Sequence, residues 1–506
     1  MAMRSAVLRM LLVSRTKNVR RRIIFASSTD VRPSTDRGQR VFQKVMPTAF
    51  AALEMIWAAC QGPQEACRSQ ALPAGNNATG LRSKADRMKI VFVNRYFHPD
   101  QSATSRMVSS LAFALARKGF PVTAIASGSH YDGTATDLPR HERIHGVEIH
   151  RLAASRFGRG RLTSRSADYA TFHIAAAAWL LANARRGDVC VVCTDPPLLS
   201  VSVALPLKLR GARLVNWVMD LFPETAIELE LFSGTGVLAA STLALRDWSV
   251  RTAALTICPI DAMSRHLAGR LGSSERIATV RHWANDAEVH PVEPSRNALR
   301  RAWGLQDSFV VGYSGNFGRA HEFSTLLSAA QLLRDEPIRF LLIGDGPRRA
   351  AVKASVGLLG LSNVMFKPYQ SSSNLAESLG AADVHIVSLL PNLEYCVIPS
   401  KLYGILAAAR PTLFVGDPQG EIGSVLRMSG CGQSVAPGDF VALAALIARL
   451  RDASQMRAAM GDRALALVRS EYSLDAGVAR WMAAVHHLLP QPHAAPSGLD
   501  TPEVAA

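Results

Sequence analysis

Two charged residues, Glu394 and Lys401, lie seven positions apart and could act on one ligand. An apolar run over 382–390 predicts a strand, a loop carrying Glu394 follows, and Ser400 opens a helix that ends before Pro411. Ser400 suits the N-cap, because its hydroxyl can accept from a free backbone N–H. Lys401 in the first turn opposes the helix dipole, so either it is a solvated surface cation or an anion docks there. This pairing of charges suits a sugar diphosphate: the carboxylate takes hydroxyls and the cation takes phosphates.

The composition is that of a globular protein with sizeable cores, and the charge is unevenly distributed. The 506 residues suffice for two or three domains, with 48% hydrophobic and 19% charged residues. Of the net charge of +17, residues 1–87 carry +10, residues 88–285 carry +8 and residues 286–506 carry −1. The first folded region therefore suits an anionic surface, either a membrane or a nucleic acid.

Seven cysteines are scattered without the spacing of a disulfide framework, which indicates a reducing compartment. Cys190 and Cys193 form a CxxC pattern, but residues three apart in a strand point to opposite faces. We therefore expect two core thiols rather than a metal site or a disulfide. No apolar run reaches the roughly 20 residues that a transmembrane helix needs.

Residues 1–87 lack the pattern of a folded domain and are expected to be a basic extension of low order. No clean apolar stretch with a cleavage site follows the basic residues, so we find no signal peptide. A first strand begins at 88–93, and we expect Met88 to lie close to the true start. The alternative is a disordered basic arm that binds anionic lipid. The tail, 491–506, is also expected to be disordered.

From residue 89 short apolar strands alternate with helices, which is typical of doubly wound parallel sheets. The strands expected in the first series are 90–93, 121–126, 188–193, 213–219 and 254–258. The helices expected there are 102–117, 170–184, 198–209, 238–253 and 262–271. A second series begins with strand 309–313, helix 323–334 and strand 338–343. We therefore expect two Rossmann-like α/β domains, 88–285 and 286–470, and a C-terminal helix in 471–490 that packs back on the first domain. Ligands should bind beyond the carboxyl ends of the strands.

Five segments, in the same order along the chain, resemble motifs of the GT-B glycosyltransferases of family 4. The resemblance is to the branch of bacterial exopolysaccharide, colanic acid and O-antigen biosynthesis, and its segments are 94–105, 220–224, 313–319, 344–347 and 399–404. It implies a GT-B fold and retaining transfer from a UDP- or GDP-sugar, without a metal or other cofactor. The second domain would hold the donor, and the first domain would hold an undecaprenyl-diphosphate-linked saccharide. The protein would be cytoplasmic, peripheral on the anionic inner face of the membrane through its basic first domain, with no nucleic-acid partner.

The resemblance implies a catalytic set of Glu394, Arg319, Lys401 and Asp220. Arg319 and Lys401 would clamp the diphosphate as the leaving group departs. Glu394 would bind donor-sugar hydroxyls or stabilise the positively charged sugar of the transition state. Asp220 could hold acceptor hydroxyls or accept a proton. The alternatives stay open: a surface ion pair for Arg319, a solvated loop acid for Glu394, and a turn-capping residue for Asp220.

The chain departs from the family pattern at several positions. Gly404 stands where the second glutamate of the donor loop is usual, and Glu421 is a candidate substitute for its ribose contact. Further donor-side candidates are glycines of close backbone approach and polar loop residues: Gly315, Asn316, Gly318, His321, Gly344, Gly346, Ser400, Ser102 and Thr104. His98 and Glu224 are the candidates on the acceptor side.

Other functions remain open at this point. A sugar-nucleotide epimerase of the same two-domain architecture would release an altered sugar nucleotide without an acceptor. A non-catalytic protein that binds lipid or nucleic acid would use the basic face alone. A NAD-dependent enzyme is disfavoured, because neither half carries a Gly-x-Gly-x-x-Gly after its first strand.

Overall fold

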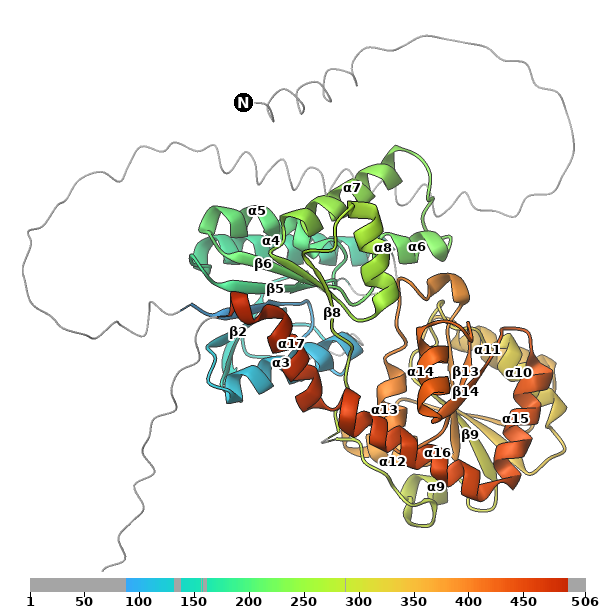
Figure 1. Ribbon diagram of the computed structural model, residues 1–506. Helices are drawn as coiled ribbons and strands as arrows, with labels where there is room; N and C mark the ends of the chain where they lie inside the picture. The colour runs from blue at the N-terminus through green and yellow to red at the C-terminus, as the bar shows by residue number, and fades with distance from the viewer. Residues whose placement is uncertain (1–87, 132–137, 156, 158–161, 287, 490–506) are drawn as a thin grey trace, which may run out of the picture.

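The computed structural model describes residues 88–131, 138–155, 157, 162–286 and 288–489, so the expectations for 1–87 and 491–506 lie outside the described residues. Two α/β domains, each built on a mostly parallel sheet, lie side by side (Figure 1). This architecture confirms the prediction of two doubly wound, parallel-sheet domains.

The first sheet has the strand order β3-β4-β2-β1-β5-β6-β7-β8. Its strands are β1 (Ile90–Val93), β2 (Val122–Ser127), β3 (His141–Ile144), β4 (Val147–Leu152), β5 (Val189–Cys193), β6 (Arg213–Trp217), β7 (Leu255–Cys258) and β8 (Ile277–Thr279). Its helices are α3 (Ala103–Arg117), α4 (Leu162–Asn183), α5 (Leu199–Arg210), α6 (Glu224–Glu228), α7 (Val237–Thr252) and α8 (Asp261–Leu271). The central strands β1 and β5 are continuous apolar runs because helices cover both faces of the sheet.

The hairpin formed by β3 and β4 is an element that the sequence reading did not assign. The two strands pair antiparallel at the edge of the first sheet, around a turn at His145 and Gly146 with φ of 48° and 84°. In β4, Val147 and Ile149 are buried, whereas Glu148 between them is exposed. Few residues of this hairpin are apolar, so its sequence does not resemble the continuous apolar runs of the central strands.

The second sheet has the order β11-β10-β9-β12-β13-β14 and is entirely parallel. Its strands are β9 (Phe309–Ser314), β10 (Ile338–Ile343), β11 (Val364–Lys367), β12 (Val384–Ser388), β13 (Thr412–Val415) and β14 (Gly432–Val435). Its helices are α9 (Ala298–Ala302), α10 (Ser324–Leu332), α11 (Arg349–Leu358), α12 (Leu375–Gly380), α13 (Lys401–Ala407), α14 (Glu421–Ser429), α15 (Phe440–Asp452) and α16 (Ser454–Leu467). The loops after β9, β10, β12 and β13 share the edge where parallel-sheet ligands bind.

The chain passes between the domains twice, and the two crossings are hydrogen-bonded to each other. The backbone N–H of Ala284 donates to the carbonyl oxygen of Tyr472 over 2.7 Å. The second crossing leads into α17 (Leu474–Val485), which packs on α3 of the first domain. There Trp481 joins the core of the first domain, with its ring centroid 6.4 Å from that of Trp217.

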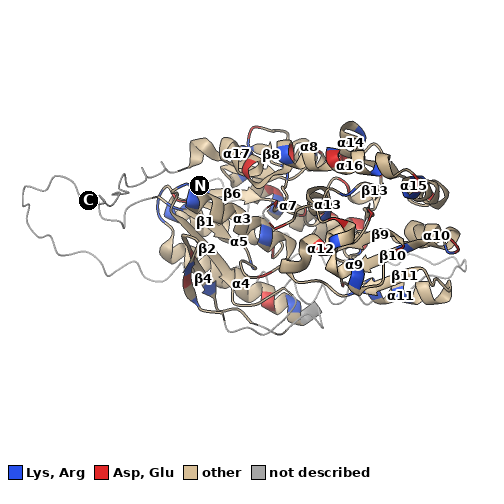
Figure 2. Cartoon of the chain, turned by 90° about the horizontal axis from the view of Figure 1, so that it is seen from below, with Lys and Arg blue, Asp and Glu red and all other residues tan. Residues whose placement is uncertain are grey.

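Buried cysteines occupy both faces of the first sheet, as the sequence predicts. Cys193 belongs to the core beneath α3 and α17, whereas Cys190 belongs to the core beneath α4 and α5. Among the described helices, none is long and apolar enough to cross a membrane. Lys and Arg residues occur in both domains (Figure 2).

Candidate active site

The loops that follow β9 and β10 pack backbone against backbone at the carboxyl edge of the second sheet. A Cβ on Gly344 would lie 2.0 Å from the carbonyl oxygen of Gly315, and one on Gly346 would lie 2.3 Å from the side-chain oxygen of Asn316. Gly344 and Gly346 also have φ of 133° and 145°, which L side chains rarely adopt. Main chain rather than side chains therefore forms this part of the edge.

The ammonium group of Lys401 lies over this main-chain edge. Its Nζ donates to the Tyr313 hydroxyl over 2.6 Å and lies 3.9 Å from the centroid of the Tyr313 ring. A Cβ on Gly315 would lie 3.3 Å from Cε of Lys401. Burial lowers the pKa of Lys401 to about 7, and no carboxylate among the described residues pairs with it. A cation enclosed by protein without a counter-ion marks a place for an anion.

His321 is the second neighbour of this ammonium group, and its tautomer follows from its contacts. Its Nδ1 lies 2.6 Å from the carbonyl oxygen of Ser388, so Nδ1 carries the proton. Its Nε2, 3.4 Å from Nζ of Lys401, is then free to accept. Burial and the charge of Lys401 lower the pKa of His321 to about 3, which keeps the ring neutral. His321 therefore orients Lys401 and is not a second cation for a phosphate.

Arg319 lies on the same loop, and its side chain is exposed. It forms no hydrogen bond or ion pair with any described residue. Its neighbour Ala320 accepts a hydrogen bond from the backbone N–H of Leu390, which joins the β9 loop to the β12 loop. Gly318 is close by, since a Cβ there would lie 3.2 Å from the side-chain nitrogen of Asn316. The surface ion pair, which was the alternative for Arg319, is absent among the described residues.

Ser400 stands at the N-cap of α13, but its side chain makes no capping hydrogen bond. This corrects the expectation that the Ser400 hydroxyl caps the helix. Its φ and ψ of −58° and −17° are already helical, whereas a capping side chain needs an extended N-cap residue. Because α13 has only seven residues, positive charge at this edge comes from Lys401 rather than from a long helix dipole.

Glu394 lies beside the loop after β13 and not beside Lys401. A Cβ on Gly420 would lie 1.6 Å from its Oε2, so the carboxyl group fills the space that a side chain at Gly420 would occupy. Its Oε1 is buried and has no hydrogen-bond partner. Burial, with Asp417 as the next cause, raises the pKa of Glu394 to about 7. An unsatisfied buried oxygen on a carboxyl group that titrates near neutrality is suited to take a ligand hydroxyl.

Glu421, the candidate for the ribose contact, is hydrogen-bonded to the first domain. Its Oε1 accepts from Nε of Arg281 over 3.0 Å, and its Oε2 accepts from the backbone N–H of Asp261 over 3.0 Å. Nη2 of Arg281 also donates to Asp261 over 2.7 Å. Both carboxylate oxygens are therefore held by the first domain. Glu421 is thus part of an interdomain contact, and its substitution for the missing second glutamate stays a prediction.

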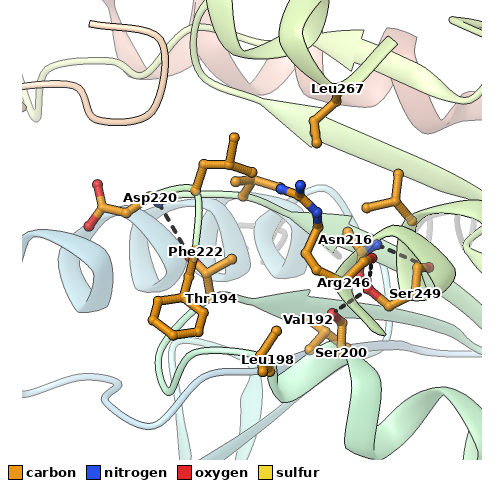
Figure 3. A pocket seen from close by; sticks show the side chains of 13 residues that line it. Val192, Thr194, Leu198, Ser200, Asn216, Asp220, Phe222, Arg246, Ser249 and Leu267 are labelled. Atoms are coloured by element: carbon orange, nitrogen blue, oxygen red, sulfur yellow. Dashed lines mark hydrogen bonds between the residues drawn. The ribbon is translucent and has the colours of Figure 1, made fainter. Parts of the chain in front are cut away.

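Asp220 lies where β6 of the first domain leads into a small pocket (Figure 3). The pocket encloses about 30 Å³, room for one or two water molecules, and is lined by the carboxyl ends of β5 and β6 with parts of α5 and α7. The Asp220 side chain points away from Arg246 and is open to solvent at the pocket mouth. The surrounding protein and the charge of Asp195 raise the pKa of Asp220 to about 6. A carboxylate with this pKa can accept a proton near neutral pH.

Glu224, an acceptor-side candidate, faces the interior of the first domain. Its two oxygens accept from Nη1 and Nη2 of Arg246 over 3.2 and 2.5 Å, and Nε2 of His266 lies 3.1 Å away. Nε of Arg246 also donates to Asp247 over 2.8 Å. Charged groups this deeply buried are stable only when paired, so Glu224 is the counter-ion of Arg246.

The remaining first-domain candidates lie at the start of α3. Ser102 donates its backbone N–H to Asp100 over 2.9 Å, and Thr104 is half-buried in the first turn. The His98 ring packs edge-on against Phe113, with centroids 5.6 Å apart. Burial, then the neighbouring His145, lowers the pKa of His98. His98 therefore lies against α3 and the β3–β4 turn.

The structure thus gathers most of the donor-side candidates and separates the others. One cluster joins Lys401, Arg319 and His321 with the four glycines and Asn316. Glu394 lies on the same edge, over β13, and its loop meets the first domain where the backbone N–H of Leu221 donates to Cys396 over 2.9 Å. Sequence reasoning missed two contributors, Tyr313 as a partner of Lys401 and Gly420 as the wall against Glu394. Both lie in segments singled out for other residues.

Comparison with known families gives a match to the model described as glycosyl transferases group 1, over residues 295–466. The chain is similar to the probable glycosyltransferase WbjE of Pseudomonas aeruginosa, with 28% identity over 61% of this chain and 77% of that protein. It is also similar to the putative colanic acid biosynthesis glycosyl transferase WcaI of Escherichia coli K12, with 24% identity over 71% of this chain and 91% of that protein.

Two solved structures share the arrangement of both domains. HepE of Anabaena, in complex with UDP and glucose, has a TM-score of 0.62 at 14% identity, covering 79% of this chain and 100% of that one. WaaG, involved in lipopolysaccharide biosynthesis, has a TM-score of 0.58 at 14% identity, covering 78% and 99% of the two chains. These likenesses confirm the predicted GT-B fold.

Proposed function

We propose that this chain, whose residues 295–466 match the group 1 glycosyltransferases, transfers a sugar, with retention at the anomeric carbon, from a nucleoside-diphosphate sugar to a lipid-linked saccharide. The donor binds the second domain and the acceptor binds the first. The transfer belongs to cell-surface polysaccharide biosynthesis, in which relatives such as WcaI are named.

The observation that carries the donor site is the ammonium group of Lys401, which lies at the glycine-lined main-chain edge without an acidic partner among the described residues. A diphosphate supplies the missing negative charge, and main-chain groups beside Gly315 can approach it without side chains between. Arg319, exposed on the same loop, adds a delocalised cation as the leaving group departs. The UDP found in the HepE structure supports a donor of this class.

Glu394 contacts the donor sugar, and Asp220 acts on the acceptor sugar. The unsatisfied Oε1 of Glu394 accepts from a hydroxyl of the donor sugar. Asp220, in the first domain, receives the proton that the acceptor hydroxyl loses when it attacks the anomeric carbon from the face that the nucleoside diphosphate leaves, so that the configuration is retained. The Leu221 to Cys396 hydrogen bond ties the two segments that carry these carboxyl groups. Lys401 and Arg319 stabilise the departing nucleoside diphosphate.

The test is transfer from a panel of UDP-, GDP- and dTDP-sugars to undecaprenyl-diphosphate-linked saccharide, with the product linkage read by NMR. We expect one donor to be used, with retention of its anomeric configuration, and Glu394→Gln to lose transfer while its melting temperature stays near that of the wild type. An inverted product would contradict the retaining assignment. Release of an altered sugar nucleotide without acceptor would support the epimerase instead.

A further inference from the structure

We infer that the outer face of α4, α5 and α7 is a docking surface for an anionic phospholipid bilayer. The inference rests on the proposed function, because a lipid-linked acceptor is presented at a bilayer, and it assigns the contact to particular residues. Helix α5 contacts both α4 and α7, and Figure 1 shows the three helices on one side of the first sheet. The inner sides of α4 and α5 contribute residues such as Phe172, Leu180 and Val203 to the core, and the outer sides have no partner among the residues that the structure describes.

Each of the three helices presents large apolar side chains to solvent. These are Ile174 and Leu181 on α4, Leu205 and Leu209 on α5, and Trp248 on α7. Leu209 is 61% exposed and Trp248 is 40% exposed. One exposed leucine is ordinary on a protein surface, but five large apolar side chains on three touching helices form a patch that needs an apolar partner.

The exposed charges on these helices and in the loop that follows α4 are all positive. Five exposed cations accompany the patch: Arg185, Arg186, Lys208, Arg210 and Arg251. The acidic residues of the three helices are Asp168 and Asp247, and both are buried and face inward. Apolar side chains ringed by Lys and Arg, without exposed carboxylates, complement an anionic bilayer better than a protein or nucleic-acid surface.

The place where the described chain begins also supports an anionic bilayer as the partner of this face. A Cβ on Gly187 would lie 2.5 Å from the sulfur of Met88, so the described chain begins beside Arg185 and Arg186. The preceding residues 1–87 carry a net charge of +10. Cations at helix C-termini also offset the helix dipole, which explains Lys208 and Arg210 in part. The dipole does not account for the exposed Leu181, Leu209 and Trp248 beside them.

The proposed face lies close to the pocket at Asp220. Ser200, near the start of α5, lines the pocket that Asp220 opens, and Leu209 is near the end of the same helix. The two positions are about 14 Å apart along the helix axis. A bilayer on this face would therefore hold a lipid-linked saccharide within one short helix of the pocket mouth.

The experiment is flotation of the full chain with vesicles of phosphatidylcholine alone or mixed equally with phosphatidylglycerol. We expect wild type to bind the mixed vesicles and to float poorly with phosphatidylcholine alone. Two variants test the face: the apolar variant Leu205→Ser/Leu209→Ser/Trp248→Ser and the charge variant Arg185→Glu/Arg186→Glu/Lys208→Glu. We expect the affinity of each for the mixed vesicles to fall by about tenfold or more. All six side chains are exposed, and melting temperatures verify that the variants fold.

Matched variants in the second domain provide the control. Leu358 and Met428 are 89% and 83% exposed, so Leu358→Ser/Met428→Ser removes two large, highly exposed apolar side chains from the second domain. Arg339→Glu/Lys353→Glu/Arg469→Glu reverses three exposed charges there. We expect both controls to bind vesicles as wild type does. Quenching of fluorescence by brominated lipid, lost in part in Trp248→Phe, would report the contact directly.

Two results would overturn the inference. One is vesicle binding by the α4–α5–α7 variants at the level of wild type, which would leave residues 1–87 as the lipid-binding part. The other is equal binding of wild type to neutral and anionic vesicles. Binding is measured without donor or acceptor, so Glu394→Gln should float as wild type does. Failure of docking is thereby separated from failure of the proposed transfer reaction.

Discussion

Nζ of Lys401 lies 2.6 Å from the hydroxyl oxygen of Tyr313, whose own proton goes to the carbonyl oxygen of Asn316 over 2.8 Å. The phenol is thus an acceptor for the ammonium group and not a counter-charge. The folded protein holds a cation among neutral groups, and an anionic ligand relieves the cost of burying it.

Replacing Lys401 by methionine should weaken catalysis and strengthen the fold. We expect kcat/KM to fall by about 100-fold, because one charge-assisted contact to the departing diphosphate is lost. We also expect the ligand-free variant to melt at a higher temperature than wild type, because methionine fills similar space without a buried charge. Steady-state kinetics and thermal melting check the two effects. Lys401→Arg, which keeps the charge, is the control, and a Lys401→Met variant of lower melting temperature would contradict the assignment.

The stability gain in Lys401→Met should depend on pH. The pKa of Lys401 is about 7 in the folded protein, against an ordinary value of 10.5. The unfolded chain therefore binds more protons between these values, and folding stability rises with pH across that window. The destabilisation by Lys401 is full below pH 7 and gone above 10.5. Urea unfolding of wild type and Lys401→Met at about pH 6.5 and about pH 9 measures the difference in their free energies of unfolding. This difference should be smaller at the higher pH.

Donor binding should weaken as pH rises through about 7. A bound diphosphate favours the ammonium form of Lys401, so binding takes up a proton wherever the free protein has lost it. Calorimetry with the preferred nucleotide sugar in buffers of different ionisation enthalpy measures both the affinity and the proton uptake. Lys401→Met should show neither effect, whereas an unchanged profile in this variant would assign the titration to another group.

Gly420→Ala should reduce transfer without loss of folding. The φ of Gly420 is −64°, which alanine adopts freely, but the new Cβ would lie 1.6 Å from Oε2 of Glu394. The carboxyl group must then move, and we expect kcat to fall by about 10- to 100-fold. Gly357→Ala is the matched control, because a Cβ there meets nothing within 4 Å in α11. That change should leave activity intact and add about 0.5–1 kcal/mol of stability.

Glu421→Gln should leave donor affinity within about twofold of wild type, because its oxygens contact Arg281 and Asp261 rather than a nucleotide. The lost ion pair is partly exposed, so we expect a stability loss of about 1 kcal/mol or less. Isothermal titration and urea unfolding give the two numbers. A large loss of nucleotide affinity would return Glu421 to the ribose role that the sequence suggests.

Arg246→Met should destabilise the first domain by about 3–5 kcal/mol, because it leaves Glu224 and Asp247 buried without their counter-ion. Adding Glu224→Gln to this variant should recover part of the loss, since one of the two uncompensated charges is then removed. Urea unfolding curves of the single and double variants measure the coupling. Equal stability of wild type and Arg246→Met would show that the network contributes little.

Much of the fold followed from the sequence, because buried parallel strands such as β1 and β9 are continuous apolar runs between helices. The edge hairpin of β3 and β4 did not, since one buried face leaves only a few apolar positions to recognise. Among the site residues, the grouping of Lys401 with Gly315 followed from the topology of the sheet. The contact of Glu421 with Arg281 joins residues 140 positions apart and has no local signature. The ion pair of Glu224, an acceptor-side candidate, had no local signature either, because its partner Arg246 lies on another helix.

The paired crossings at Ala284 and Tyr472 have a mechanical consequence. Two connections tied together by a hydrogen bond resist twisting of one domain against the other far more than a single connection would. A swing of the domains about the line that joins the two crossings is the motion that this link opposes least. Such a swing would change the separation of the loops that carry Asp220 and Lys401, while the link keeps the two sheets in angular register.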